Sequence, residues 1–116
     1  KGEHFSVITG SDHLLFASLL VGGDGCIGTG VNLVPQRFVQ LWEAVHEGRI
    51  DEARAVQRRI SAMHQAIGYG DFPAGIKAVL SLMGIGQPVV ASPRRSVTRD
   101  ELKQIEAYWT EMQMSD

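Results

Sequence analysis

Apolar residues follow two different spacings over the first third of the chain. In residues 4–9, Phe5, Val7 and Ile8 have only small polar residues between them, which is typical of a short buried strand. Residues 13–21 are apolar on almost every side and end at a pair of glycines, which predicts a helix that is covered on more than one side. A second apolar run, rich in glycine, occupies residues 25–31. We therefore predict two strands, Phe5–Thr9 and Cys26–Val31, joined by a helix.

Helical spacing dominates the rest of the chain, where we predict four helices. Their apolar faces are Phe38, Leu41, Trp42 and Val45; Ala53, Val56, Ile60, Met63 and Ile67; Ile76, Val79, Leu80 and Met83; and Leu102, Ile105, Trp109 and Met112. Thr98 and Glu101 have the spacing of a capping box, in which each side chain satisfies a backbone N–H of the other residue. Near the start of the chain, the Asp12 carboxylate is predicted to cap the helix that follows the first strand.

The predicted order of elements is β-α-β-α-α-α-α, which makes the two strands adjacent and parallel. Parallel strands are normally buried on both faces within a larger sheet, so two of them alone make a poor fold. A (β/α)8 barrel needs roughly 250 residues, whereas this chain has 116. We therefore predict an α/β fold, the C-terminal fragment of a (β/α)8 TIM barrel. Residues 1–48 would form its last two βα units and residues 49–116 a C-terminal helical extension of the same domain.

Composition excludes several classes of protein. The net charge is −2 and 44% of the residues are hydrophobic, without the clustered basic face of a nucleic-acid-binding protein. No apolar run approaches the roughly 20 residues of a membrane span. Cys26 is the only cysteine, so no disulfide can form within the chain, and a cytoplasmic location is expected. The four histidines lack metal-ligand spacing, and we expect neither a metal nor another cofactor.

Three runs of residues resemble, in their order and spacing, the C-terminal part of one enzyme family. The run V-I-T-G-S-D at Val7–Asp12 is similar to the end of the family's seventh barrel strand, and the run G-G-D-G-C-I-G-T-G-V-N at Gly22–Asn32 is similar to its eighth. Gly70–Ala78 resembles a segment that leads into a later helix. The family is that of the pyruvate-handling Schiff-base lyases, dihydrodipicolinate synthase and N-acetylneuraminate lyase among them. The resemblance covers nearly the whole chain.

The resemblance implies a class I lyase that acts on pyruvate or a related 2-oxo acid, by aldol cleavage or condensation or by dehydration. A lysine amine forms an imine with the substrate's C2 carbonyl, and the protonated imine accepts electrons while the neighbouring bond breaks or forms. In the family, that lysine and a proton-relaying tyrosine lie upstream of the position of Lys1. We therefore expect this chain to lack both and to be inactive by itself. The family also implies a homo-oligomer, a tetramer, for the full-length protein.

Five residues are expected from the same resemblance to contact the substrate. They are Gly10, Ser11, Ile27, Gly28 and Thr29. The Gly10 carbonyl would face the substrate, and Ile27 would pack beside the imine. Each of the five also has an ordinary interpretation, as part of a turn, a core or a tightly packed strand.

Two departures from the family's pattern bear on the substrate. Ala91 stands where the family commonly has the arginine of an Arg-x-Pro sequence, and the Gly-Tyr-Gly-Asp segment at residues 68–71 lacks the Asn-Pro of many synthases. Both departures favour the sugar-acid aldolases and dehydratases of the family over its synthases.

Other residues that could carry chemistry have simpler explanations. Asp12 is interpreted as a helix cap rather than an acid catalyst, and Cys26 as a small buried hydrophobic residue. Lys77 and Lys103 lie on predicted helices rather than at the end of a strand. A solvent-facing lysine amine is almost entirely protonated at neutral pH and does not form imines. Neither lysine is therefore expected to be catalytic.

Two alternative functions remain from the sequence. The glycines of Gly25-x-x-Gly28-x-Gly30, followed by a helix, could cradle a phosphate in a barrel module without Schiff-base chemistry. The chain could also be an independent helical interaction domain. The apolar residues that follow the glycines offer few polar groups to a phosphate, which favours the lyase.

Overall fold

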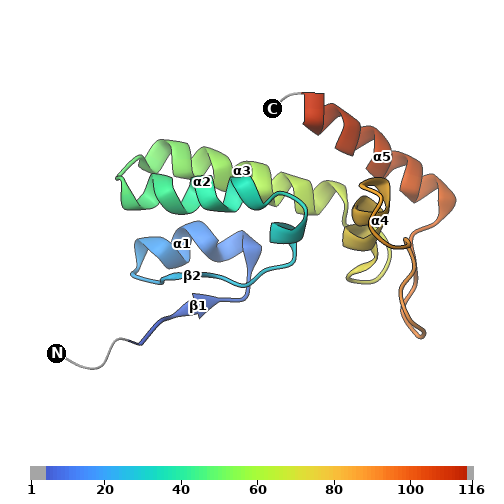
Figure 1. Cartoon of the computed structure of the whole chain (residues 1–116), viewed down its shortest axis with the longest axis horizontal. Coiled ribbons are helices and arrows are strands. Elements are labelled where there is room, and N and C mark those ends of the chain that lie inside the picture. The colour runs from blue at the N-terminus through green and yellow to red at the C-terminus, as the bar shows by residue number, and fades with distance from the viewer. Residues whose placement is uncertain (1–4, 115–116) are drawn as a thin grey trace. The chain divides into compact units, whose positions relative to one another are not determined.

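The computed structural model describes residues 5–114, and its elements follow the predicted order (Figure 1). Contacts divide the chain into two compact units, one that ends at Ala62 and one that begins at Met63. The elements are the strands β1 (Ile8–Thr9) and β2 (Gly25–Cys26), the 3-10 turns η1 (Asp12–Leu14) and η2 (Gly30–Asn32), and the helices α1 (Leu15–Leu20), α2 (Pro35–His46), α3 (Ile50–Ala66), α4 (Ala74–Leu82) and α5 (Arg99–Met114).

The two strands pair in parallel, as predicted, with Ile8 opposite Gly25 and Thr9 opposite Cys26. Both strands are shorter than predicted. Residue 4, with which the first apolar run begins, lies outside the described residues. The prediction of a buried first strand is wrong in this chain, since Phe5 is 85% exposed. A parallel strand is buried only when further layers cover both faces, and within its unit the pair is covered by α1 on one side (Figure 1).

The second strand is shorter than predicted because its backbone leaves the hydrogen-bond ladder with the first strand after Ile27. Beyond Cys26, the Ile27 N–H still donates to the Thr9 carbonyl at 3.0 Å. The Gly30 N–H then donates to the Asp12 carboxylate at 2.8 Å, and η2 begins at that residue. A side chain of the first βα connection therefore replaces the strand ladder that was predicted to continue to residue 31.

The core of the first unit lies where α1 packs on β2 and against α2 (Figure 1). Leu15, Phe38 and Leu41 are buried there, with Leu41 fully so. Trp42 was predicted on the same face, but it is 41% exposed. Its indole N–H donates to the Asp24 carbonyl at 3.0 Å, and its ring stacks on His46 at a centroid distance of 3.7 Å. The four-residue step from Phe38 rotates this bulky ring to the edge of the apolar face.

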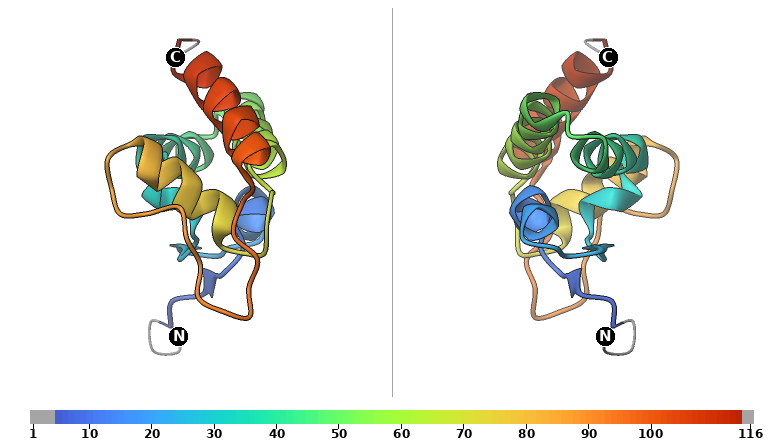
Figure 2. Two further views of the ribbon diagram at one scale, coloured as in Figure 1. Left: turned by 90° about the vertical axis from the view of Figure 1, so that its right-hand side faces the viewer. Right: turned by 90° about the vertical axis from the view of Figure 1, so that its left-hand side faces the viewer.

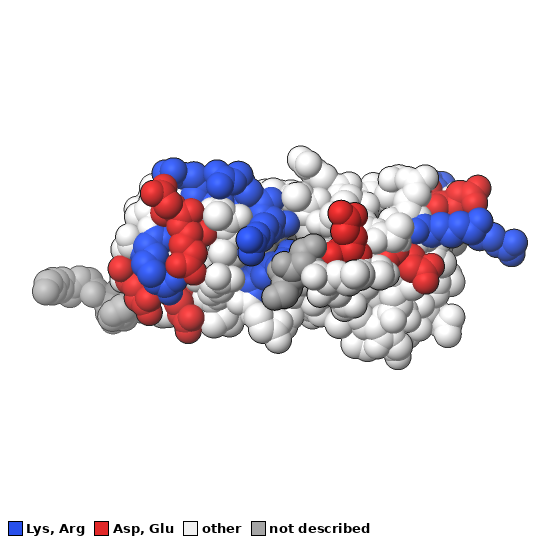
Figure 3. Space-filling view, turned by 90° about the horizontal axis from the view of Figure 1, so that it is seen from above, with Lys and Arg blue, Asp and Glu red and all other residues white. Residues whose placement is uncertain are grey.

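α3 is the longest helix and lies beside α2 in both views (Figures 1 and 2). Its predicted apolar stripe is confirmed, because every member is at most 2% exposed: Ala53, Val56, Ile60, Met63 and Ile67. Its outer surface carries mixed charges (Figure 3), including an exposed Arg54–Asp51 ion pair. Such surface pairs contribute little to stability.

In the second unit α4 packs against α5, and the start of α5 confirms the predicted capping box. The Thr98 N–H donates to the Glu101 carboxylate at 2.7 Å, and the Glu101 N–H donates to the Thr98 hydroxyl at 3.2 Å. Arg95 also donates to Glu101, and this hydrogen bond lowers the pKa of Glu101 to about 2. On α4, Val79 is buried as predicted, whereas Met83 is 41% exposed because it falls just past the end of the helix.

Candidate functional site

The parallel strands end at one edge and bring four of the five expected substrate contacts together. The hydrogen bond from the Ile27 N–H to the Thr9 carbonyl continues the ladder beyond the last paired residues. Gly10 and Ser11 therefore follow β1 directly beside Ile27 and Gly28, which follow β2, and Thr29 comes next along the chain. The carboxyl ends of parallel strands are where α/β proteins place their ligand sites.

The exposure of these residues fits a surface rather than a core. Ile27 is 78% exposed, Gly10 is exposed, and Ser11 is half-buried. The Ser11 N–H donates to the Thr9 hydroxyl at 3.3 Å, which fixes the direction in which the chain leaves β1. The interpretation of Ile27 as an ordinary core residue is therefore wrong for this chain.

Asp12 is the buried polar group of this edge, with 5% of its surface exposed. Its prediction as a helix cap is wrong, because its carboxylate crosses to the segment after β2. There it accepts the Gly30 N–H at 2.8 Å and the Cys26 thiol at 3.6 Å. An ionised carboxylate makes stronger hydrogen bonds to N–H groups than a neutral acceptor does. Asp12 thus ties the two strand ends to each other.

Gly28 is a glycine because Asp12 occupies the space that a side chain would need. A Cβ atom on Gly28 would overlap Oδ1 of Asp12. The arrangement also argues against the phosphate cradle, because the Gly30 N–H already serves a carboxylate. A phosphate placed there would meet a negative charge rather than a free donor.

Gln57 is a residue of this site that the sequence analysis missed. It lies on α3, is 9% exposed, and binds the first βα connection with both ends of its amide. Oε1 accepts the Phe16 N–H at 2.9 Å, and Nε2 donates to the Asp12 carbonyl at 2.9 Å. The sequence signal that could have found it was its position directly after Val56, beside the apolar stripe. A polar residue that is buried there must be hydrogen-bonded.

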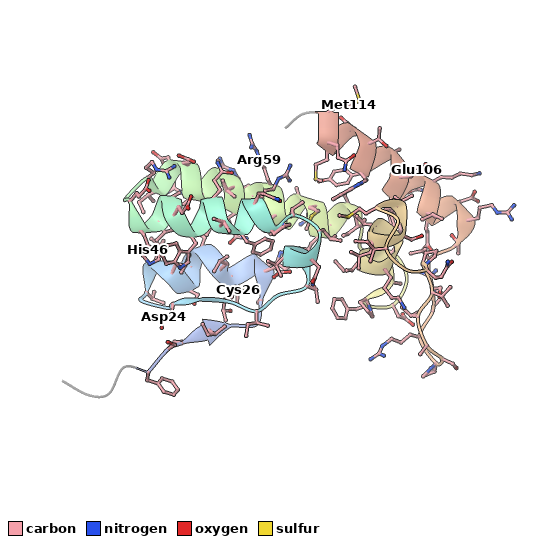
Figure 4. All side chains as sticks on the ribbon, in the orientation of Figure 1. Asp24, Cys26, His46, Arg59, Glu106 and Met114 are labelled. Carbon is pink, nitrogen blue, oxygen red and sulfur yellow. The ribbon has the colours of Figure 1, made fainter. Side chains whose placement is uncertain are left out.

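Cys26 is a half-buried residue of β2 (Figure 4) rather than a fully buried one. Burial, together with the adjacent Asp12 carboxylate and its hydrogen bond, raises the pKa of the Cys26 thiol to about 11. At pH 7.5 less than about one thiol in a thousand is then ionised, and only the thiolate is a good nucleophile. The residue is not suited to nucleophilic catalysis.

We expect Cys26 to react slowly with iodoacetamide at pH 7.5 and faster as the pH approaches 11. Asp12→Asn removes the negative charge beside the thiol, so its pKa should fall and the rate at pH 7.5 should rise by about tenfold. The measurement is the time course of alkylation of the Cys26 peptide by mass spectrometry. Asp24→Asn, which alters a carboxylate two residues away, is the control. Equal rates in the two variants would contradict the role given to Asp12.

The two lysines among residues 5–114 lie on helices of the second unit. Lys103 is exposed on α5, with its amine 3.3 Å from the Asp100 carboxylate. Lys77 is half-buried on α4. Lys1 lies outside the described residues. Among residues 5–114 no group of three or more His, Cys, Asp or Glu side chains is placed to hold a metal ion, and no helix is long and apolar enough to cross a membrane.

The sequence model of the dihydrodipicolinate synthetase family matches residues 1–112. The chain belongs to this family. The 4-hydroxy-tetrahydrodipicolinate synthase of Chlorobium phaeovibrioides is 34% identical to it over 105 residues, which are 90% of this chain and 36% of that protein. The chain therefore spans little more than a third of the length of such a family member.

Solved structures of the family share the fold of the chain. Dihydrodipicolinate synthase from Bacteroides thetaiotaomicron has a TM-score of 0.83 and 27% identity, and the match covers 92% of this chain and 38% of that one. YagE, a prophage protein of the dihydrodipicolinic acid synthase family from E. coli K12, was solved in complex with pyruvate. It has a TM-score of 0.76 and 28% identity, and the match covers 95% of this chain and 38% of that one.

Proposed function

We propose that this chain is the C-terminal portion of a class I Schiff-base lyase that acts on pyruvate or a related 2-oxo acid. Residues 1–48 supply the last two βα units of its (β/α)8 barrel, and residues 49–116 supply the helical extension of the same domain. The proposed enzyme is a homo-oligomer, a tetramer, in the cytoplasm. The enzyme uses no metal or other cofactor, and it has no nucleic-acid or membrane partner.

The observation that carries the proposal is that the Gly10–Ser11 segment meets the glycine-rich segment after β2 at the carboxyl ends of adjacent parallel strands. Active sites of (β/α)8 enzymes lie at that end of the barrel. Gly10 and Ser11 reach it from β1, and Ile27 and Gly28 from β2, with the Thr9–Ile27 hydrogen bond holding them side by side. Pyruvate bound to YagE, a member of the same family, supports a 2-oxo acid as the ligand.

The proposed chemistry needs a lysine amine at a strand end, and the lysines among residues 5–114 lie on helices. A neutral lysine amine from the upstream part of the protein adds to C2 of the 2-oxo acid. The adduct takes up one proton and loses water to give a protonated imine. The imine accepts the electron pair of the bond that breaks at C3, or releases it when that bond forms. The residues of this chain form the wall of the site: the Gly10 carbonyl faces the substrate, and Ile27 shields the imine from water.

The second substrate separates the members of the family, and two observations point in different directions. The Chlorobium relative is named a synthase, whereas Ala91 and the segment at residues 68–71 lack the residues expected of a synthase. The proposal is therefore stated at the imine step, which the two groups share. The second substrate follows from measuring turnover with aspartate semialdehyde and with a 2-keto-3-deoxy sugar acid.

The testing experiment is reduction with borohydride in the presence of pyruvate, followed by measurement of the intact mass. The complete protein that contains this segment should gain one reduced pyruvate per chain, because hydride adds to C2 of the imine and leaves a stable secondary amine. The 116-residue chain by itself should gain none, because Lys77 and Lys103 lie on helices rather than at the strand ends.

Two results would contradict the proposal in different ways. An adduct on the 116-residue chain that maps to Lys77 would place the catalytic amine within it. No adduct on the complete protein would remove the Schiff-base assignment. Acetate, which has no ketone to form an imine, is the matched control ligand and should give no adduct with either protein.

A further inference from the structure

The Gln57 amide joins α3 to the backbone that carries two of the proposed substrate contacts. The residue lies 45 positions along the chain from Asp12 and 41 from Phe16, yet it hydrogen-bonds to both. The same Nε2 also lies 3.4 Å from the Ser61 hydroxyl on the next turn of α3. Because the side chain is buried and both ends of its amide are engaged, it has one orientation.

One of these hydrogen bonds satisfies a backbone group that the helix leaves unpaired. Phe16 is the second residue of α1, and the first N–H groups of a helix have no partner within it. Leu14, which precedes α1, makes no side-chain cap hydrogen bond, so Gln57 provides the cap from another helix. The Asp12 carbonyl lies in η1, directly before α1. One side-chain amide therefore fixes both the start of α1 and the turn that precedes it.

The turn held in this way connects the two strand ends of the candidate site. The Asp12 side chain holds the Gly30 N–H, and its backbone is held in turn by Gln57. We propose that Gln57 is a positioning residue of the lyase: by fixing the Asp12 backbone, it holds Gly10 and Ser11 against the substrate. This inference rests on the function proposed above and adds to it a residue that does not touch the substrate.

Only an amide suits this position, which gives the inference a sharp test. An amide donates with its nitrogen and accepts with its oxygen, whereas a carboxylate only accepts and an aliphatic chain does neither. Gln57→Leu keeps a similar volume but removes both hydrogen bonds, the one to the Asp12 carbonyl and the one from the Phe16 N–H. Gln57→Glu keeps the acceptor for Phe16 and places a second oxygen against the Asp12 carbonyl.

The experiment measures borohydride-trapped pyruvate adduct on the complete protein at increasing pyruvate concentration. Gln57→Leu should raise the pyruvate concentration that gives half-maximal adduct by about tenfold, because the displaced Gly10–Ser11 segment binds pyruvate less well. The maximal adduct per folded chain should stay the same, because the catalytic amine is untouched. Gln65→Leu, a matched change at an exposed position of α3, should leave both quantities unchanged.

Gln57→Glu adds a readout that a purely structural role would not produce. At low pH the introduced carboxyl group is protonated and can donate to the Asp12 carbonyl, as the amide does. As the pH rises the group ionises, and the donor is lost. The half-saturating concentration of this variant, divided by that of the wild type at the same pH, should therefore lie near one at pH 5 and rise several-fold by pH 8.

The possible outcomes separate this inference from the proposed function. No adduct on the wild-type protein overturns the proposed function. An adduct on the wild type with unchanged half-saturation in Gln57→Leu overturns the positioning role alone. A lower maximal adduct in Gln57→Leu at unchanged half-saturation shows that Gln57 serves folding only, and it also overturns the inference. The expected shift in half-saturation, with the pH-dependent ratio in Gln57→Glu, supports it.

Discussion

Replacing Gly28 with alanine is expected to destabilise the protein and to weaken pyruvate binding together. The new Cβ atom overlaps the Asp12 carboxylate, which has little room to move because it is buried and hydrogen-bonded to Gly30. Displacing it leaves the Gly30 N–H without its acceptor. We expect the free energy of unfolding of the complete protein to fall by about 2–4 kcal/mol. The measurement is urea denaturation followed by circular dichroism.

The same variant should need at least about tenfold more pyruvate for half-maximal trapping, because Gly28 and Gly10 lie at the shared strand edge. Gly25→Ala is the matched control. Its Cβ atom would lie 3.6 Å from the Ile8 side chain, an ordinary contact, so both quantities should change little. Equal stability of the two variants would show that Asp12 moves aside freely, and would contradict its role as the tie between the strand ends.

Gly75→Ala is expected to have the largest effect on stability in the second unit. The first turn of α4 lies so close to the end of α3 that a Cβ atom on Gly75 would overlap the Ile67 carbonyl oxygen. That oxygen belongs to the backbone, so the overlap is relieved only if the helix itself moves away. Because Ala74, Ile76 and Val79 are buried, such a movement opens the core of this unit. We expect a loss of more than about 3 kcal/mol.

This loss is measured by urea denaturation of the complete protein, with Ser81→Ala as the control. Ser81 lies near the other end of the same helix, where added helix propensity should change the stability by less than about 0.5 kcal/mol. Pyruvate trapping per folded chain should be unchanged in Gly75→Ala, since the residue is outside the unit that carries the strand ends. A stability of Gly75→Ala equal to that of the control would show that the two segments separate without cost.

Local signals in the sequence were enough to predict the helices. The spacing of Val56, Ile60 and Met63 predicts α3, and the pair of Thr98 and Glu101 predicts the start of α5. Both depend on contacts within a few residues, which helical geometry fixes wherever the helix lies. The parallel pairing of the strands also followed from the sequence, because a helix between two adjacent strands leaves them parallel.

Contacts between distant residues were decided only by the tertiary structure. The sequence allows Asp12 to cap its own helix, but the folded chain brings the Gly30 N–H within 2.8 Å of its carboxylate. In the sequence, Gln57 is one polar residue beside an apolar stripe. Only the fold brings its side chain to the start of α1. Both side chains can bond either nearby or distant backbone groups, so their partners depend on which chain segments meet. The lengths of the strands and the exposure of Trp42 depend on such packing for the same reason.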